Sequence, residues 1–175
     1  MNAAADSAAV PFARTARRED AVEIARIYNE GIEDRVATFE TDLRGERDVL
    51  RWFDEDRTMV VVEAGGRVCA FASAFAYRPR ACYAGVREFS VYVSRDVRGR
   101  SFGRIALEAL IAAARARGDW KLLSRVFPEN TGSMKLLKSL GFREVGLYVR
   151  HAKLDGEWRD VVIVEKLIDE AGAGT

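Results

Sequence analysis

The middle of the chain carries the feature that most constrains its fold: a strand that leads through an arginine- and glycine-rich loop into a long helix. Residues 88–93 form a run typical of a β-strand, and residues 104–117 have the Ala/Leu pattern of a helix. The first turn of a helix has unpaired N–H groups, and the helix dipole favours negative charge there. Gly99 and Gly103 let the backbone approach a bulky anion. The segment therefore predicts a pyrophosphate site; the alternative is an ordinary helix N-terminus with solvated arginines.

Two common phosphate-binding motifs do not fit this loop. The phosphate loop of NTPases needs Lys followed by Ser or Thr after its last glycine, and the dinucleotide fingerprint needs three glycines at fixed spacing in the first βα turn. The present loop lies mid-chain and has neither pattern. Its positive charge comes from Arg98, Arg100 and Arg104.

The composition predicts one ordinary globular domain. The chain has 175 residues, of which 49% are hydrophobic, and a formal net charge of +1. This near-neutral charge argues against a nucleic acid or a membrane surface as partner, and no apolar run is long enough to span a bilayer. Residues 1–11 lack the basic start and apolar stretch of a signal peptide. We expect flexible tails at 1–11 and 169–175 around a single domain at 12–168.

The cysteines and the histidine indicate neither a disulfide framework nor a metal site. Cys69 lies in an apolar run and is expected to be a small core residue, whereas Cys82 lies in a loop. With a single histidine and no Cys/His cluster, no metal is expected. A reducing cytoplasm is the simplest setting.

Strand and helix patterns alternate along the chain and predict an α/β fold, in which helices pack on a mixed sheet. Strands are expected at 12–16, 58–63, 67–77, 88–93, 120–127, 142–153 and 159–167, and helices at 18–30, 46–56, 104–117 and 131–140.

The loop resembles the acetyl-CoA loop of the GNAT acetyltransferase superfamily, Arg/Gln-x-x-Gly-x-Gly/Ala. Arg98 and Gly103 match its first and last positions, and Ser101 stands where the family usually has Gly. The order of elements is also similar to the GNAT fold over about residues 12–167. The resemblance implies a mixed, mostly antiparallel sheet with helices on both faces and acetyl-CoA as co-substrate. The implied cofactor-binding residues are Val91, Tyr92, Val93, Arg98, Gly99, Arg100, Ser101, Phe102, Gly103, Arg104, Asn130 and Ser133.

Shorter motifs resemble the phosphinothricin N-acetyltransferase branch of this superfamily. They lie at 27–29, 37–39, 88–93, 127–130, 140–142 and 156–161. Residues 77–83 look most like the arsinothricin-resistance acetyltransferases of the branch. The resemblance implies acetylation of the α-amine of a glutamate-like antimetabolite. Arsinothricin or phosphinothricin is favoured, methionine sulfoximine comes next, and the result is resistance. The branch is usually dimeric, with the late strands as candidate interface.

Glu88 is the candidate catalytic base. It opens the strand that leads into the loop, so its carboxylate can lie near the acetyl group, and the branch assigns a Glu at this place that role. The alternative is an exposed polar residue, or an ion-pair partner of Arg87 or Arg80.

Arg78, Arg80 and Tyr83 are the candidate acceptor-binding residues. A planar guanidinium binds carboxylate, phosphinate or arsinate groups bidentately. The alternative is a solvated basic loop. Phe39 and Thr41 lie in the segment that lines the acceptor pocket in the family; Phe39 alone also fits a buried residue that covers a loop.

Residues 130–151 contain a candidate helix cap and one position that departs from the family pattern. Asn130 is expected to cap a helix, and the resemblance adds a hydrogen bond near the thioester. Leu137 stands where many family members place a Tyr or His proposed to protonate the thiolate. A thiolate near neutral pH needs no dedicated acid, and otherwise Tyr148, Tyr83 or Ser133 takes that role. His151 on a late strand fits a structural role better.

Two other functions remain open. A non-catalytic acyl-CoA-binding or sensor module is suggested by Ser101 and Leu137, while Glu88 and the paired arginines oppose it. A peptide or protein N-acetyltransferase predicts an open acceptor groove, whereas the loops at 31–43 and 78–83 suggest a closed pocket.

Overall fold

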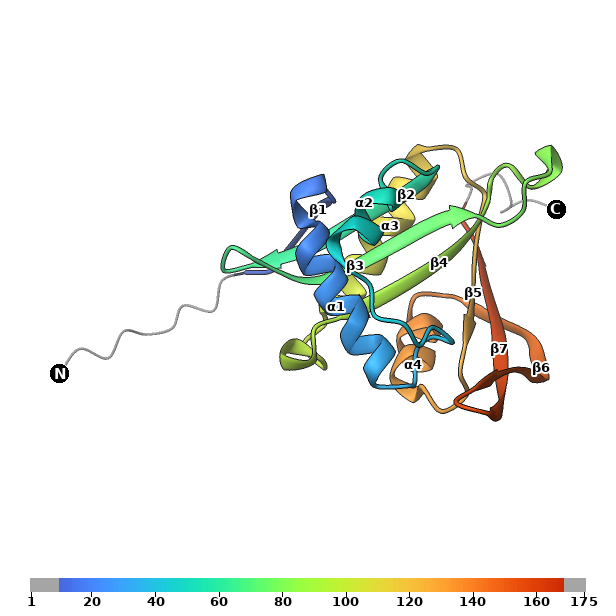
Figure 1. Cartoon of the computed structure of the whole chain (residues 1–175). Helices are drawn as coiled ribbons and strands as arrows, with labels where there is room; N and C mark the ends of the chain where they lie inside the picture. Colours follow the sequence, from blue (N-terminus) through green and yellow to red (C-terminus); the bar gives the residue numbers. More distant parts are fainter. Residues whose placement is uncertain (1–9, 169–175) are drawn as a thin grey trace.

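A seven-stranded mixed sheet runs through the protein in the computed structural model, which describes residues 10–168 (Figure 1). Its strands follow the order β1-β2-β3-β4-β5-β7-β6, and only β4 and β5 are parallel neighbours. Apart from residues 10 and 11, the tails expected at the two ends lie outside the described residues. The strands are β1 Phe12–Thr15, β2 Arg57–Ala64, β3 Arg67–Ala76, β4 Val86–Val93, β5 Lys121–Val126, β6 Arg143–Leu154 and β7 Glu157–Leu167.

Helices cover both faces of the sheet. They are α1 Ala21–Glu33, α2 Glu46–Trp52, α3 Phe102–Ala116 and α4 Thr131–Ser139. One apolar core joins α1 and α2 to the sheet and includes Ile24 and Phe71. A second core on the other face includes Leu107 of α3 and Phe89 of β4. Successive side chains of β4 point to opposite faces of the sheet, so that Phe89 enters one core and Tyr92 the other. Such alternation is required of a strand that is covered on both faces.

All four expected helices differ from the observed ones in their bounds, and the first two differ by three or more residues at one end or both. The first follows a 3₁₀ turn at Arg18–Asp20 and continues through Gly31, which was expected to be irregular. Gly31 packs so closely on Tyr92 that a β-carbon there would lie 2.7 Å from two ring atoms. The helix expected to reach residue 56 ends at Trp52, because the chain then turns to bring Asp56 onto Arg87.

Strands β4 and β5 separate after a short paired section. They are in register only from Val86–Lys121 to Glu88–Leu123. At the next position the Ser124 hydroxyl donates a hydrogen bond of 2.8 Å to the carbonyl oxygen of Phe89. Beyond it β5 continues beside β7, and Figure 1 shows β4 and β5 diverging. A gap therefore opens in the sheet at the end of β4 that leads to α3.

A buried ion-pair cluster closes the paired end of this gap. Arg87 is fully buried, and its Nε lies 3.2 Å from Asp119 Oδ1 while its Nη1 lies 2.9 Å from Asp56 Oδ2. Asp119 follows α3, and Asp56 precedes β2. The Arg87 side chain therefore fixes β4 to two neighbouring connections.

None of the helices in residues 10–168 combines the length and apolar character needed to cross a membrane. Across the same residues, the His, Cys, Asp and Glu side chains form no group of three or more that could hold a metal ion.

Candidate active site

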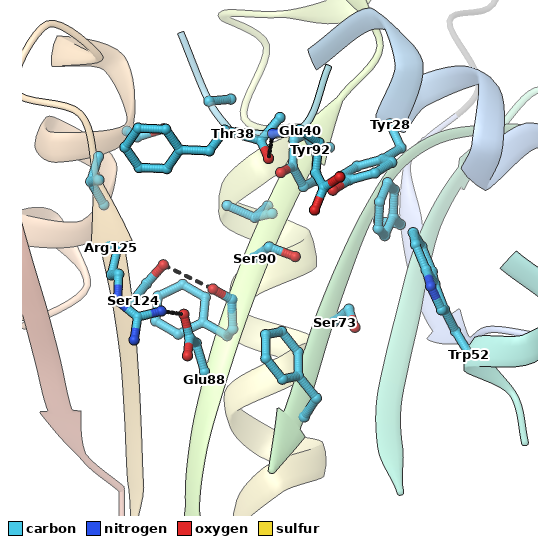
Figure 2. Close-up of a pocket in the computed structure, with 18 of the residues that line it drawn as sticks. Tyr28, Thr38, Glu40, Trp52, Ser73, Glu88, Ser90, Tyr92, Ser124 and Arg125 are labelled. Carbon is cyan, nitrogen blue, oxygen red and sulfur yellow. Dashed lines mark hydrogen bonds and ion pairs between the residues drawn. The ribbon is translucent and has the colours of Figure 1, made fainter. Parts of the chain in front are cut away.

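A cavity of about 740 Å³ lies where β4 and β5 separate, on the face covered by α1 and α2. Its size is typical of sites for small molecules. Figure 2 shows side chains of α1, α2, the segment after α1 and strands β3 to β5 converging on it. Its wall includes Tyr28, Thr38, Phe39, Trp52, Arg57, Ser73, Glu88, Ser90, Val91, Tyr92, Arg125, Asn130, Ser133 and Leu137.

Glu88 lies in the cavity wall at the point where the two strands part. Its side chain is 17% exposed and pairs with the Arg125 guanidinium of β5 (Figure 2). Neither of the partners considered from the sequence is used. Arg87 projects to the opposite face toward Asp119, as neighbouring strand residues must. A carboxylate at this position can accept a proton from a group bound in the cavity.

Two tyrosine hydroxyls and Thr38 form the roof of the cavity (Figure 2). The rings of Tyr28 and Tyr92 meet edge to face at 4.9 Å, and Tyr92 stacks on Phe71 at 5.4 Å. Burial raises the pKa of both tyrosines above the ordinary value. Both hydroxyls are therefore neutral at physiological pH and can donate hydrogen bonds to a bound molecule.

The expected acetyl-CoA loop has two residues in the left-handed backbone region. Gly99 has φ +77°, and a β-carbon there would have open space around it. Ser101, directly before α3, has φ 67° and does not cap the helix with its side chain. The first N–H groups of α3 are therefore left without a side-chain cap, as binding of a pyrophosphate requires.

The three loop arginines have different surroundings. Arg98 donates to Asp34 Oδ2 at 2.6 Å and to the carbonyl oxygen of Val93 at 3.1 Å. Arg104 donates to Ser139 Oγ at 2.6 Å and to Glu108, whereas Arg100 is exposed.

Asp34 ties the loop to the end of α1. Burial raises the pKa of its carboxyl, but the hydrogen bonds from Arg95 and Arg98 outweigh burial and hold that pKa below its usual value. The carboxylate therefore stays charged at neutral pH and fixes the Arg98 side chain. The structure thus gives Arg98 a role in positioning the loop.

The space at Gly103 is filled by the protein itself. A β-carbon at this position would lie 3.2 Å from Leu136 Cδ2 and 3.3 Å from Val93 Cγ2. We expected Gly103 to make room for an anion, but its missing side chain lets α3 pack closely on α4 and β4. Among the loop residues, Gly99 and Ser101 have the unusual backbone conformation.

We predict that Ser101→Gly raises the free energy of unfolding by about 0.5–1 kcal/mol and binds acetyl-CoA as tightly as the parent or tighter. The left-handed conformation costs a non-glycine residue about 1–2 kcal/mol, and the greater freedom of glycine in the unfolded chain offsets about 0.5–1 kcal/mol of the gain. Urea denaturation and calorimetric titration measure the two quantities. Ser101→Ala is the control and should show no gain. Weaker acetyl-CoA binding by the glycine variant would instead give the Ser101 hydroxyl a direct contact.

Residues of α4 form the opposite wall of the cavity. Asn130 caps α4 by accepting a hydrogen bond of 3.1 Å from the Ser133 backbone, and its amide donates to the Val36 carbonyl oxygen at 3.2 Å. The cap expected from the sequence is therefore confirmed. Leu137 is buried in the same wall.

The residues considered as proton donors to the thiolate in place of Leu137 differ in their position relative to the cavity. Ser133 lines the cavity, whereas Tyr83 and Tyr148 are not among its lining residues. His151 is exposed on β6 and lies beside Tyr148 at 5.2 Å between ring centroids. Ser133 is the candidate that the structure brings to the cavity.

The acceptor residues expected from the sequence are only partly brought together. Phe39 lines the cavity and packs edge to face on Phe127 at 4.8 Å, whereas Thr41 is exposed outside it. Arg78, Arg80 and Tyr83 lie in the loop after β3 and do not line the cavity. Tyr83 packs on Tyr77, and the Arg78 guanidinium lies 5.1 Å from the centre of that ring.

The sequence reasoning missed several polar residues of the cavity. Arg57, Ser73 and Arg125 belong to strands β2, β3 and β5, and each projects from the sheet into the cavity wall. The two-residue period of a strand was the available signal, because it places Ser73 and Phe75 on the same face. It could not show that this face lines a cavity, since that depends on how α2 packs.

Comparison with known proteins agrees with the cavity and the loop. The family model described as "Acetyltransferase (GNAT) family" matches residues 23–142. The chain belongs to the GNAT acetyltransferase family. A phosphinothricin N-acetyltransferase of Alcaligenes faecalis is 30% identical over 161 residues, which cover 87% of this chain and 80% of that protein. An L-methionine sulfoximine/L-methionine sulfone acetyltransferase of Pseudomonas paraeruginosa is 30% identical, covering 89% of this chain and 94% of its own length.

A solved GNAT structure extends the comparison to the bound donor. A phosphinothricin acetyltransferase from Sinorhizobium meliloti in complex with acetyl-CoA aligns with a TM-score of 0.86 at 27% identity, covering 94% of this chain and 92% of that one. The expected GNAT fold is confirmed. As a member of this family the protein is an acetyl-CoA-dependent N-acetyltransferase. The uncapped N-terminus of α3 and the gap beside β4 fit that co-substrate.

Proposed function

We propose that this acetyltransferase transfers the acetyl group of acetyl-CoA to the α-amine of a small, glutamate-like amino-acid antimetabolite. Phosphinothricin and arsinothricin are the favoured acceptors, and methionine sulfoximine comes next. Acetylation removes the positive charge of the amine and so gives resistance. The observation that carries the proposal is the Glu88 carboxylate at the parting of β4 and β5, in a cavity sized for a small molecule. The names of the relatives support the same acceptor class.

In the proposed mechanism, Glu88 accepts a proton from the acceptor ammonium, directly or through one water molecule. The free amine attacks the thioester carbonyl, the new C–N bond forms, and the C–S bond breaks to release CoA thiolate. The second proton that the nitrogen loses passes to the thiolate or to water. A thiol titrates near pH ~8.5, so the thiolate leaves without a dedicated acid at the Leu137 position. Tyr28 and Tyr92 supply neutral hydroxyls beside the reacting groups. Arg78, Arg80 and Tyr83 are proposed as further acceptor contacts, which rests on the resemblance of their loop.

The protein is further proposed to act as a homodimer in the cytoplasm, where acetyl-CoA is supplied. Strand β6 supports the dimer, because it is an edge strand with exposed apolar side chains. In the single chain the exposed fractions are 49% for Val145, 51% for Leu147 and 67% for Val149 of β6, and 54% for Trp158 of the neighbouring β7. Covering such a surface is the usual way to protect a sheet edge.

We predict that steady-state kinetics with acetyl-CoA will give the highest kcat/KM for phosphinothricin, arsinothricin or methionine sulfoximine, and low values for a polyamine and a peptide N-terminus. The reason is that the cavity has the size of a site for a small molecule, and the guanidinium groups in its wall can bind an acidic group of the acceptor. Binding of acetyl-CoA with no thiol release in the presence of any acceptor would support a binding module instead. Preference for the peptide would contradict the acceptor class while leaving the family unchanged.

A further inference from the structure

Arg57 is held more rigidly than the other guanidinium groups of the cavity wall. It is the first residue of β2, and its side chain is only 15% exposed. Its guanidinium carbon lies 4.9 Å from the ring centre of Trp52 and 4.9 Å from that of Phe75. Two aromatic faces on one planar cation fix its orientation and stabilise its charge in place.

Strand register places Arg57 in one row with Glu88. Arg57 pairs with Phe75 across β2 and β3, and Phe75 pairs with Glu88 across β3 and β4. Directly paired residues project to the same face of a sheet, and adjacent strands are about 4.8 Å apart. The α-carbons of Arg57 and Glu88 are therefore separated by about 10 Å. All three side chains line the cavity, and Phe75 lies between Arg57 and Glu88 in this row.

One edge of the Arg57 guanidinium is already occupied. Its Nε and Nη2 donate to Glu55 Oε2 at 3.1 and 2.7 Å, and that carboxylate is half-exposed. Its Nη1 lies 3.4 Å from the Ser73 hydroxyl. Ser73 is buried in β3, and Figure 2 shows its side chain directed into the cavity. The Nη1 edge and the Ser73 hydroxyl thus form a donor pair for an anion in the cavity.

The other arginines of the wall are less suited to this task. Arg125 pairs with Glu88 itself, Arg44 pairs with Glu40 in the segment before α2, and Arg51 pairs with Asp48 within α2. Their side chains are 35%, 30% and 73% exposed. An anion gains most from a guanidinium that is withdrawn from water and already oriented, which describes Arg57.

We propose that Arg57, with Ser73, binds the distal acidic group of the acceptor and so selects amino acids that carry a second acid on a short arm. This inference rests on the proposed function and names the residue that sets its acceptor class. The α-carboxylate shares one carbon with the amine, so it cannot span the Phe75 ring while the amine lies at Glu88. The phosphinate of phosphinothricin lies at the end of a two-carbon arm, so it can extend from an amine at Glu88 toward Arg57.

Calorimetric titration of Arg57→Gln tests the inference through binding, independently of turnover. The two ligands are phosphinothricin, with an anionic distal group, and methionine sulfone, whose distal group is uncharged. Loss of one charge-assisted contact should weaken phosphinothricin binding about 10- to 100-fold and leave methionine sulfone and acetyl-CoA binding nearly unchanged. Arg57→Lys should recover part of the loss, because it restores the charge without the planar fork. Thermal unfolding checks that each variant is folded.

Arg18→Gln is the matched control, since Arg18 is exposed and lies outside the cavity lining, and this variant should bind both ligands as the parent does. A second variant, Arg80→Ala, removes the contact proposed for the loop after β3. Loss of phosphinothricin binding in this variant, with Arg57→Gln unaffected, would move the anion contact to the loop and overturn the inference. If Arg57→Gln weakens the binding of both ligands equally, Arg57 acts only in packing and the inference fails. If the parent acetylates both compounds but Arg57→Gln binds normally, only this inference fails. If the parent neither binds nor acetylates either compound, the proposed function fails with it.

Discussion

Glu88→Gln is expected to lower kcat/KM for the amino-acid acceptor by about 10²–10⁴-fold, the usual contribution of a general base. The amide has nearly the same shape as the carboxylate but cannot accept the proton of the ammonium group. Because Glu88 lies in the cavity wall and the pyrophosphate is proposed to bind at the N-terminus of α3, acetyl-CoA affinity should stay nearly unchanged. Steady-state kinetics and calorimetric titration separate the two effects.

Glu129→Gln is the control for this loss. Glu129 is a carboxylate in the connection after β5, and its side chain is 57% exposed opposite Arg159. Its replacement should leave kcat/KM close to that of the parent. A Glu88→Gln enzyme with the parent rate at neutral pH would remove Glu88 from the mechanism and leave it as the ion-pair partner of Arg125.

Arg87→Leu is expected to lower the free energy of unfolding by about 3–5 kcal/mol, the cost of breaking a buried ion pair from one side. The substitution removes Arg87 from the buried Asp119 carboxylate, whose remaining ion-pair partner is the partly exposed Arg117, with its Nε 3.4 Å from Asp119 Oδ2. Urea denaturation measures the change. The effect is large because Arg87 is fully buried and fixes β4 to the connections before β2 and β5.

Addition of Asp119→Asn to Arg87→Leu should restore part of the stability, because it removes the charge of the buried carboxylate that has lost Arg87. Simple additivity of the two substitutions, with the double variant less stable than either single one, would contradict the ion-pair explanation.

The order of strands and helices could be predicted because each element carries its own period of apolar residues. The run at 88–93 lies within β4, and the Ala/Leu pattern of 104–117 begins inside α3 and ends one residue beyond it. The bounds were less accurate where tertiary packing decides them. Gly31 stays helical because its missing β-carbon admits the Tyr92 ring from a strand far along the chain, and no local pattern contains that information.

The candidate site could be predicted only where a motif or a strand position identified it. Glu88 and Asn130 were found in this way. Arg57 was missed because its environment is made by Trp52 of α2 and Phe75 of β3, which meet only in the folded chain. Arg98 was expected at the anion, but its partner Asp34 lies 64 residues earlier in the sequence. The arginines at 78 and 80 have the right chemistry, yet the loop that carries them lies outside the cavity lining.

The central claim is that one cavity brings acetyl-CoA to the α-amine of a small acidic amino acid. Mass spectrometry of a reaction with acetyl-CoA and phosphinothricin, together with measurement of released CoA thiol, tests it most directly. The claim predicts a product heavier by one acetyl group, attached to the α-amine and formed in equal amount to the thiol, and almost none with Glu88→Gln. Binding of acetyl-CoA without an acetylated product from phosphinothricin, arsinothricin or methionine sulfoximine would contradict it.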